Sequence, residues 1–464
     1  MEKIHFIGIG GIGMSGLAAI SLAEGKEVSG SDLYGNDLTG QLSGRGAVIY
    51  LGHSAGNVAS DVSLVVRSAC IKDDNPEVSK ARELGVPVIS RGEYLKTVME
   101  RFPVSVAVTG THGKTTTSAL IAHIMESCGE DPTVVVGGEI GNLGSNAKLG
   151  KSDLIIAEVD ESDGTFRDIR PTYALITNVE REHMDHYGSM ENLLKAYEEF
   201  IGGVSSEGAL LFNGEDLVLK QMTKEAKSSL VNFGIKNDFT VTCVNLDYKK
   251  AIEFELVISG MNLGKVKSSL VGRHNVFNIL GAIALCMQTG LDFEAVSEAV
   301  ASFSGVKRRF DIRGKIGSIE VIEDYAHHPT ELAAVIRAAR DYGKGRIITV
   351  FQPHRYSRTH DLAHDFLHCF YDSDVLILTE VYSAFEDGAE KTDIREIFGK
   401  IAKERFECLD FVEKDRIPEY ISGLVRENDI ILVLGAGDIR EVSDPIVEKI
   451  REKTEDRRQK IEDR

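Results

Sequence analysis

The feature that most constrains the fold of this chain is the alternation of short apolar runs with helical patterns along its length. Apolar runs that lead through a turn into a helix are typical of α/β domains with parallel sheets. Three such blocks begin near residues 4, 104 and 311, and 464 residues are too many for a single core. The sequence therefore predicts three domains, at 1–102, 103–310 and 311–464.

Each block contains several predicted strands. They lie at 27–30, 47–50, 64–67 and 87–89, at 133–136, 154–158 and 173–177, and at 320–323, 347–351, 375–380 and 430–434. Between them, the polar and apolar alternation of 204–270 predicts antiparallel strands, and 274–290 predicts a helix. The charged tail after Ile450 predicts a solvated helix end or disorder.

Composition excludes some classes of partner. The formal net charge of −19 disfavours nucleic acid and anionic membranes as partners. The six cysteines are scattered without a C-x-x-C pair, which indicates neither a disulfide framework nor a zinc site. No leader pattern opens the chain and no apolar run approaches 18 residues, so we expect a cytoplasmic protein without membrane insertion.

The first block contains a glycine-rich turn, GIGGIGMSG at 8–16. Gly8, Gly10 and Gly13 fit the spacing G-x-G-x-x-G, and Asp32 follows 19 residues after Gly13. This is the dinucleotide-binding fingerprint, whose glycines let the backbone approach a diphosphate. Taken alone, it favours an NAD-dependent dehydrogenase.

A second glycine turn, TGTHGKTTT at 109–117, lies between an apolar run and a helical pattern. This is the context of a phosphate-binding loop, in which Lys114 reaches the β- and γ-phosphates and Thr115 binds Mg²⁺. Val108 stands where the usual pattern has its first glycine, so Gly110 and Gly113 carry the turn. We expect ATP or GTP here; an ordinary turn or a non-catalytic nucleotide-binding module are the alternatives.

Acidic residues follow the next two predicted strands. AEVDESDGTF begins at Ala157, and ITNVEREHMDHYG begins at Ile176. Ligands gather at the carboxyl ends of parallel strands, so Glu158 and His183 are candidate metal ligands, and one of Asp160, Glu161 and Asp163 can balance the charge of the ion. The alternative is a pair of solvated loops.

Polar clusters also mark the later segments. In GRHNVFNILGA (272–282), Asn275 and Asn278 share a helix face and can read an adenine edge or cap the helix. EDYAHHPTEL (323–332) and FQPHRYSRTHDL (351–362) follow predicted strands. Arg355 and Arg358 suit bidentate binding of a carboxylate or phosphate, and KRRF (307–310) can reach a phosphate; solvated basic segments are the alternative.

In this order, the seven motifs from TGTHGKTTT to FQPHRYSRT resemble those of the Mur ligases over nearly the whole chain. The resemblance implies a Rossmann-like N-terminal UDP-sugar domain, a central P-loop ATPase domain and a Rossmann-like C-terminal domain for the amino acid. It is strongest to the branch that joins L-alanine to the lactyl carboxylate of UDP-N-acetylmuramate through an acyl phosphate. The branch that joins a recycled tripeptide to the same UDP-sugar is the alternative.

The resemblance also implies roles for individual residues. For ATP they are Gly110, Thr111, His112, Gly113, Lys114, Thr115, Thr116, His274, Asn275, Asn278, Arg309 and Asp324. For the UDP-sugar and L-alanine they are Gly10, Gly11, Gly13, Ser15, Asp32, Ser68, Tyr325, His327, Arg355 and Arg358. Thr115, Glu158 and His183 are implied for Mg²⁺ or Mn²⁺, and Lys114, His327, Arg355 and Arg358 for catalysis.

Two positions depart from the family pattern. Glu182 stands where an aspartate usually precedes the ligand histidine, and SAFEDG (383–388) replaces the A-G-E of the family. The second departure lies in a loop that bears on which amino acid the protein selects. The sequence leaves both a monomer and a homodimer open.

Overall fold

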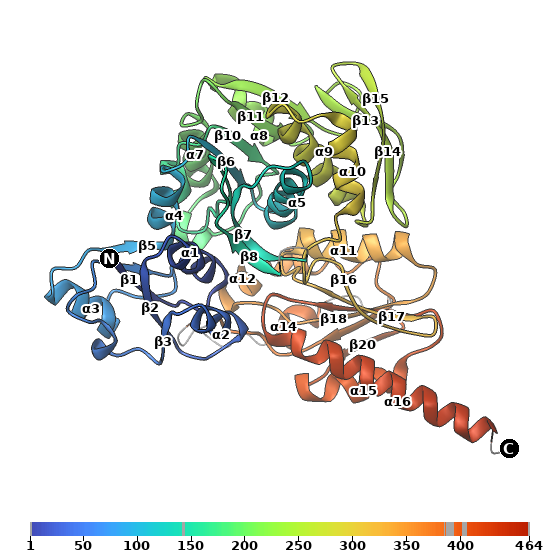
Figure 1. Cartoon of the computed structure of the whole chain (residues 1–464). Helices are drawn as coiled ribbons and strands as arrows, with labels where there is room; N and C mark the ends of the chain where they lie inside the picture. Colours follow the sequence, from blue (N-terminus) through green and yellow to red (C-terminus); the bar gives the residue numbers. More distant parts are fainter. Residues whose placement is uncertain (1, 142–143, 385, 387–393, 401–405, 463–464) are drawn as a thin grey trace. The chain divides into compact units, whose positions relative to one another are not determined.

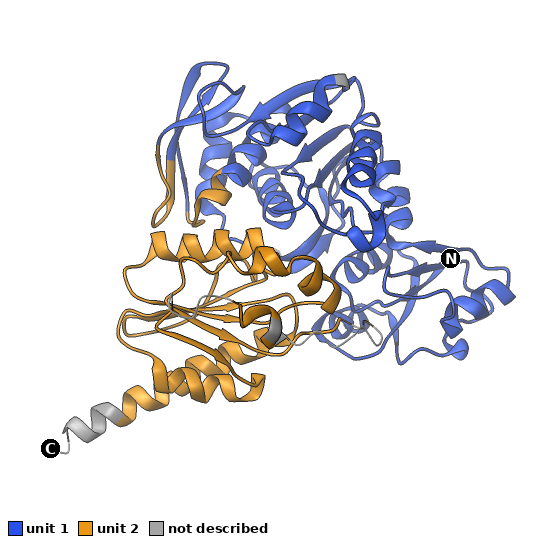
Figure 2. Ribbon diagram, turned by 180° about the vertical axis from the view of Figure 1, so that it is seen from behind, with its two compact units in different colours: residues 1–245, 254–268, 277–306 blue, residues 246–253, 269–276, 307–464 orange. Residues whose placement is uncertain are grey.

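The computed structural model describes residues 2–141, 144–384, 386, 394–400 and 406–462 (Figure 1). Among the described residues it contains three sheets, of five, ten and six strands, in which parallel strand pairs predominate. The predicted three-domain α/β class is confirmed. By contacts the chain forms two compact units, the first comprising residues 1–245, 254–268 and 277–306, and the second the remainder (Figure 2). The boundaries at 102/103 and 310/311 stay a prediction.

The first sheet has the order β3-β2-β1-β4-β5, and all of its strand pairs are parallel. Ile4 and Phe6 of the central strand are fully buried. The four predicted strands are confirmed, with bounds that differ by one or two residues. The elements are β1 (Lys3–Ile7), α1 (Ile12–Ala23), β2 (Glu27–Asp32), α2 (Asp37–Gly44), β3 (Val48–Leu51), the 3₁₀ turn η1 (Ala55–Asn57), β4 (Leu64–Arg67), α3 (Pro76–Glu83), β5 (Val88–Ser90) and α4 (Arg91–Met99).

The second sheet has the order β15-β14-β13-β12-β11-β10-β6-β9-β7-β8. Its strands are β6 (Val104–Thr109), β7 (Thr133–Ile140), β8 (Ser145–Lys148), β9 (Leu154–Glu158), β10 (Tyr173–Ile176), β11 (Ala209–Asn213), β12 (Ser229–Phe233), β13 (Val241–Asp247), β14 (Ile252–Ile258) and β15 (Met261–Ser268). Its helices and 3₁₀ turns are α5 (Lys114–Ser127), η2 (Thr165–Asp168), α6 (Met184–Tyr187), α7 (Met190–Ile201), α8 (Leu217–Met222), η3 (Thr223–Glu225), α9 (Arg273–Gln288) and α10 (Phe293–Ser302).

One prediction in this region is partly wrong. The polar and apolar alternation of 204–270 predicted antiparallel strands, yet β11 and β12 pair in parallel with their neighbours. The helices α7 and α8 return the chain to the same end of the sheet before each of these strands, as parallel pairing requires. The alternation is better matched by β13 and β14, which are neighbours joined by residues 248–251 alone.

The third sheet has the order β16-β17-β21-β18-β19-β20, with β16 antiparallel and the other pairs parallel. Its strands are β16 (Asp311–Ile316), β17 (Ile319–Asp324), β18 (Ile347–Phe351), β19 (Val375–Leu378), β20 (Cys408–Phe411) and β21 (Ile430–Leu434). Its helices and 3₁₀ turns are α11 (Pro329–Tyr342), α12 (Tyr356–Asp361), α13 (Ala363–Phe366), α14 (Ile394–Phe398), η5 (Lys414–Arg416), α15 (Ile417–Leu424), η6 (Asp438–Val442) and α16 (Ser443–Glu462).

The charged tail continues as part of the helix α16 as far as Glu462. Among the residues that the structure describes, no helix combines the length and the apolar character that crossing a membrane requires.

Candidate functional site

The three motif-bearing loops of the second sheet meet because their strands are neighbours. β6 lies between β9 and β10, and both pairs are parallel. In the register, Val108 lies opposite Glu158, and Thr109 lies opposite Ile176. The three strands therefore end level with one another, and the loops that follow them share one edge of the sheet.

The loop after β6 is shaped by glycine and held by the loop after β10. Gly113 has a φ of +82° and caps α5, a conformation that favours glycine. The backbone N–H groups of Thr111 and His112 donate to the backbone and side-chain oxygens of Asn178, at 3.0 and 2.9 Å. The loop thus places the N-terminus of α5, with its positive dipole end, at the edge of the sheet, where an anion is favoured.

Lys114, at the start of α5, is paired with a buried carboxylate. Its Nζ donates to Oε1 and Oε2 of Glu161, at 3.1 and 2.9 Å, and to Gly110 O at 2.5 Å. Burial together with the neighbouring Asp160 raises the pKa of Glu161 to about 7, against the opposing effect of Lys114. Glu161 is missing from the predicted set of site residues. The signal that finds it is its place directly after the strand next to β6.

The predicted ligands Thr115 and Glu158 are brought together. The Thr115 hydroxyl donates to Glu158 Oε1 at 3.0 Å, and Gly137 N donates to Glu158 Oε2 at 2.6 Å. Thr115 and the following Thr116 are both buried. The hydroxyl and the carboxylate are oxygen donors of the kind that Mg²⁺ prefers.

The third predicted ligand, His183, belongs to an adjacent cluster. Glu161, Glu182 and His183 each offer one ligand atom, and these atoms lie within 4.8 Å of one another. His183 has a φ of +57°, in the left-handed region, which costs about 1–3 kcal/mol for a residue other than glycine and is common at functional sites. The two carboxylates are ligands that suit Mg²⁺ or Mn²⁺.

The predicted adenine contacts lie near the start of α9. Asn278 lies beside the phosphate loop, because a Cβ placed on Gly113 would come within 2.5 Å of Asn278 Oδ1. Asn275 donates from Nδ2 to Val271 O at 2.8 Å. Burial, with the nearby positive charge of Arg309, lowers the pKa of His274 to about 4, so this imidazole is neutral at pH 7.

The glycine loop of the first sheet is fixed by the end of β2. Gly10 N donates to Asp32 Oδ2 at 2.9 Å, and Gly11 caps α1. Asp32, which the resemblance implied for the UDP-sugar, thus supports the loop backbone. Ser68 lies next to this loop, since a Cβ on Gly8 would meet Ser68 Cβ at 3.0 Å.

Ser15 is placed differently from the other predicted sugar contacts. It is buried in α1, its hydroxyl donates to Ile12 O at 2.9 Å, and Asn146 Nδ2 donates to it at 3.4 Å. This hydroxyl is therefore already used inside the helix and toward β8.

In the third sheet, the end of β17 is held by a buried acid. Asp324 accepts from Phe310 N at 2.7 Å and from Ala326 N at 2.8 Å. Burial raises its pKa to about 6. The guanidinium of Arg309 lies 5.2 Å from the ring centre of Tyr325, within reach of a cation–π contact.

A group of rings surrounds His327 at the same edge. His327 Nδ1 lies 3.0 Å from Tyr325 O and 3.4 Å from Glu331 Oε2, and its ring centre lies 5.9 Å from that of His354. Burial and the nearby His327 and Arg358 lower the pKa of His354 to about 2. His354 and its stacked partner Tyr382 are missing from the predicted set, although both follow parallel strands as His327 does.

The two predicted arginines are held by their surroundings. Arg355 Nε lies 3.3 Å from Glu386 Oε1, and Arg358 Nη1 donates to His354 O at 3.2 Å. Glu386 also accepts from Tyr356 N at 2.6 Å. Of the divergent segment, Phe385, Asp387 and Gly388 lie outside the described residues, so the expectation for this loop is addressed at Ser383, Ala384 and Glu386.

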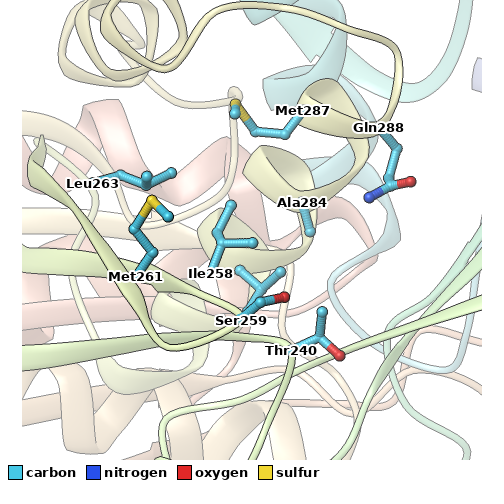
Figure 3. A pocket seen from close by; sticks show the side chains of 9 residues that line it. Thr240, Ile258, Ser259, Met261, Leu263, Ala284, Met287 and Gln288 are labelled. Carbon is cyan, nitrogen blue, oxygen red and sulfur yellow. The ribbon is translucent and has the colours of Figure 1, made fainter.

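A pocket of about 360 Å³ lies elsewhere in the first unit, between α9 and the hairpin of β14 and β15 (Figure 3). Its walls include the side chains of Ile258, Met261 and Met287, and none of its lining residues belongs to the predicted site. An apolar lining without converging charged groups does not suit a phosphate ligand.

The fold and these loops define a three-domain α/β protein with glycine-rich loops between strand and helix in its first two sheets. Comparison with known families identifies it further. The Mur ligase family catalytic domain matches residues 3–103, the Mur ligase middle domain matches 108–286, and the Mur ligase glutamate ligase domain matches 308–437. The chain belongs to the Mur ligase family.

Similar proteins match over almost the whole chain. The UDP-N-acetylmuramate--L-alanine ligase of Trichlorobacter lovleyi is 39% identical over 97% of this chain and 99% of its own length. That of Aquifex aeolicus is also 39% identical, over 97% and 98%. The crystal structure of UDP-N-acetylmuramate-alanine ligase MurC from Thermotoga maritima has a TM-score of 0.84 at 32% identity and covers 97% and 100%.

Proposed function

We propose that this protein joins L-alanine to the lactyl carboxylate of UDP-N-acetylmuramate with the hydrolysis of ATP, in the synthesis of peptidoglycan precursors. The observation that carries the proposal is the identity of 39% over 97% of the chain to ligases named for this reaction. The level edge formed by β6, β9 and β10 supports it, because a phosphate loop and a cluster of acids meet there.

A carboxylate is a poor electrophile, so the reaction requires activation. Transfer of the γ-phosphoryl group of ATP to the lactyl carboxylate gives an acyl phosphate and ADP. Lys114, at the N-terminus of α5, is placed to neutralise charge on the transferring group, with Arg309 as the second proposed cation. In this step Lys114 exchanges the carboxylate of Glu161 for phosphate oxygens.

The proposed metal ligands are Thr115, Glu158 and His183. To this set we add Glu161 and Glu182. A bound Mg²⁺ or Mn²⁺ supplies charge neutralisation and orientation for the phosphates. The protein itself fixes the Thr115 hydroxyl and the Glu158 carboxylate against each other and against Gly137 N.

The second step is attack of the alanine amine on the acyl phosphate, with loss of phosphate from a tetrahedral intermediate. The amine must lose a proton, and His327 is our proposed base or orienting group. Its Nδ1 lies 3.0 Å from Tyr325 O, a contact that orients the ring. Arg355 and Arg358 are the proposed binding groups for carboxylates.

Release of phosphate from ATP in the presence of UDP-N-acetylmuramate, screened across amino acids, tests the proposal. We expect release with L-alanine and incorporation of labelled L-alanine into the UDP-sugar. Incorporation of a labelled tripeptide in its place would favour the recycling ligase. Release with no amino acid tried would contradict both. A change in NADH absorbance with a UDP-sugar would revive the dehydrogenase interpretation.

The role of His327 has its own test. If the variant His327→Ala kept full turnover at saturating substrates, its assignment as base or orienting group would be wrong. The matched control is His360→Ala, because His360 lies exposed on the neighbouring helix α12.

A further inference from the structure

Arg91 connects the glycine loop of the first sheet to the acidic loop of the second. It is the first residue of α4, which a capping box of Ser90 and Glu93 fixes in place. A Cβ placed on Gly13 would lie 3.1 Å from Arg91 Cδ and 3.3 Å from Arg91 Nη1. The arginine side chain therefore lies directly against the first turn of α1, where the glycine loop ends.

The other end of this side chain binds the loop after β9. Arg91 Nη2 donates to Asp160 Oδ2 at 3.1 Å, and the Arg91 side chain is only 16% exposed. Although burial opposes it, the positive charges of Arg91 and Lys114 lower the pKa of Asp160 to about 2, so the carboxylate is charged at neutral pH. Its Oδ1 accepts from Ser162 N at 3.0 Å, which anchors the acidic loop.

The residue after Asp160 is the partner of the phosphate-loop lysine. Glu161 holds Lys114 Nζ at 2.9 and 3.1 Å. Because Asp160 and Glu161 are adjacent in the chain, a displacement of the backbone at Asp160 is passed directly to Glu161. An unbroken path of contacts thus runs from Gly13 through Arg91, Asp160 and Glu161 to Lys114.

We propose that Arg91 is a positioning residue that couples the two phosphate sites: a diphosphate on the glycine loop and a triphosphate on the phosphate loop change each other's affinity through the Arg91–Asp160 ion pair. The proposal rests on the proposed function for the identity of the two ligands. A diphosphate beside Gly13 adds negative charge next to the guanidinium, which weakens the hold of Arg91 on Asp160. By linkage, the effect on the two affinities is reciprocal.

The packing of α1 and α4 does not depend on the ion pair between Arg91 and Asp160. Asn146 Nδ2 donates to Ile12 O at 2.5 Å, and a Cβ on Gly92 would lie within 1.7 Å of Thr165 Oγ1. These close approaches, of β8 to α1 and of η2 to α4, do not involve the ion pair. Removal of Arg91 is therefore expected to change the coupling and leave the fold in place.

The experiment is calorimetric titration of the full chain with a non-hydrolysable ATP analogue and Mg²⁺, with and without saturating UDP-N-acetylmuramate. The ratio of the two dissociation constants is the coupling factor. In the unmodified chain we expect the two dissociation constants to differ by a factor of about 5 or more, within the usual range for allosteric coupling. Arg91→Ala and Asp160→Asn should each bring the factor close to 1, and the double variant should add nothing further.

Two further variants distinguish a loss of coupling from a general loss of structure. Arg91→Lys keeps the charge and should retain part of the coupling. Arg101→Ala is the matched control, because Arg101 pairs with Glu24 at 2.7 Å within the same domain and should leave the factor unchanged. A unit factor in the unmodified chain, or an unchanged factor in Arg91→Ala, would overturn the proposal. Failure of the proposed function looks different: no alanine-dependent phosphate release, while the two ligands still bind and the factor still responds to Arg91.

Discussion

The two glycine loops of this protein share a backbone plan and differ in the buried glutamate that supports each one. Both loops follow a central parallel strand and open a helix. Glu77 lies behind the first loop, since it binds Ser31, whose backbone oxygen accepts from Gly8 N and Ile9 N at 2.8 and 3.0 Å. Glu161 lies beside the second loop and binds its lysine.

The two carboxyls have opposite pKa shifts. Although burial opposes it, hydrogen bonds from His5, Ser31 and Asn57 lower the pKa of Glu77 to about 2. The pKa of Glu161 is instead raised to about 7, because burial and neighbouring carboxylates outweigh Lys114. A carboxylate surrounded by hydrogen-bond donors is a fixed part of the structure. Glu161 instead binds Lys114 and lies 4.0 Å from His183 Nε2, and Lys114 can exchange it for another anion. Our proposal accordingly assigns substrate binding to the first loop and phosphoryl transfer to the second.

The largest expected effect is at Lys114, because this lysine distinguishes the second loop from the first most directly. Lys114→Ala should lower kcat by about 10³-fold, near the upper end for loss of one donor to a developing charge. Nucleotide-dependent phosphate release measures it. Lys148→Ala is the control, because Lys148 forms only partly exposed ion pairs with Glu126 and Asp131. Near-normal turnover in Lys114→Ala would break the comparison between the loops.

Glu77→Gln should weaken the fold rather than the chemistry. The folded-state pKa of about 2 lies below the ordinary value of 4.5, so the stabilisation is fully present above pH 4.5 and is lost as the pH falls through 2. The shift corresponds to at most about 3 kcal/mol at neutral pH. Urea unfolding at pH 7 and pH 3 measures it. An equal loss of stability at both pH values would contradict a role for the charge.

The backbone plan of both loops could be predicted from the sequence, but the partners of their side chains could not. Glycine spacing and apolar runs report local conformation, and they correctly placed the turn between β6 and α5 and the acids that follow β9 and β10. Glu77 lies 69 residues beyond Gly8, in a helix with no motif of its own, and only the parallel order β3-β2-β1-β4 brings it there. Glu161 was visible as one of several acids, and the adjacency of β6 and β9 singles it out.

Glu161→Gln should reduce activity by about 10- to 100-fold, the usual cost of losing a partner that orients a functional group. The raised pKa of the carboxyl means that the unmodified fold loses stability as the pH rises from 4.5 to 7, and the amide should remove that dependence. Steady-state kinetics and thermal unfolding between pH 5 and 8 measure the two effects. Glu407→Gln is the matched control, because Glu407 is a partly exposed acid. Unchanged kinetics in Glu161→Gln would show that Glu161 does not contribute to activity through the lysine that it binds.

The smallest expected effect is at Asp32, where the first loop differs most from a dinucleotide site. Asp32→Asn keeps an oxygen that can accept from Gly10 N, so it removes the charge and preserves the loop. We expect the KM for UDP-N-acetylmuramate to rise by less than about 5-fold, in line with the loss of no more than one ordinary hydrogen bond. Asp32→Ala removes the acceptor as well and should raise this KM further. If both variants raised it equally and by 100-fold or more, Asp32 would contact the ligand directly, and the first loop would owe its binding to a side chain as the second does.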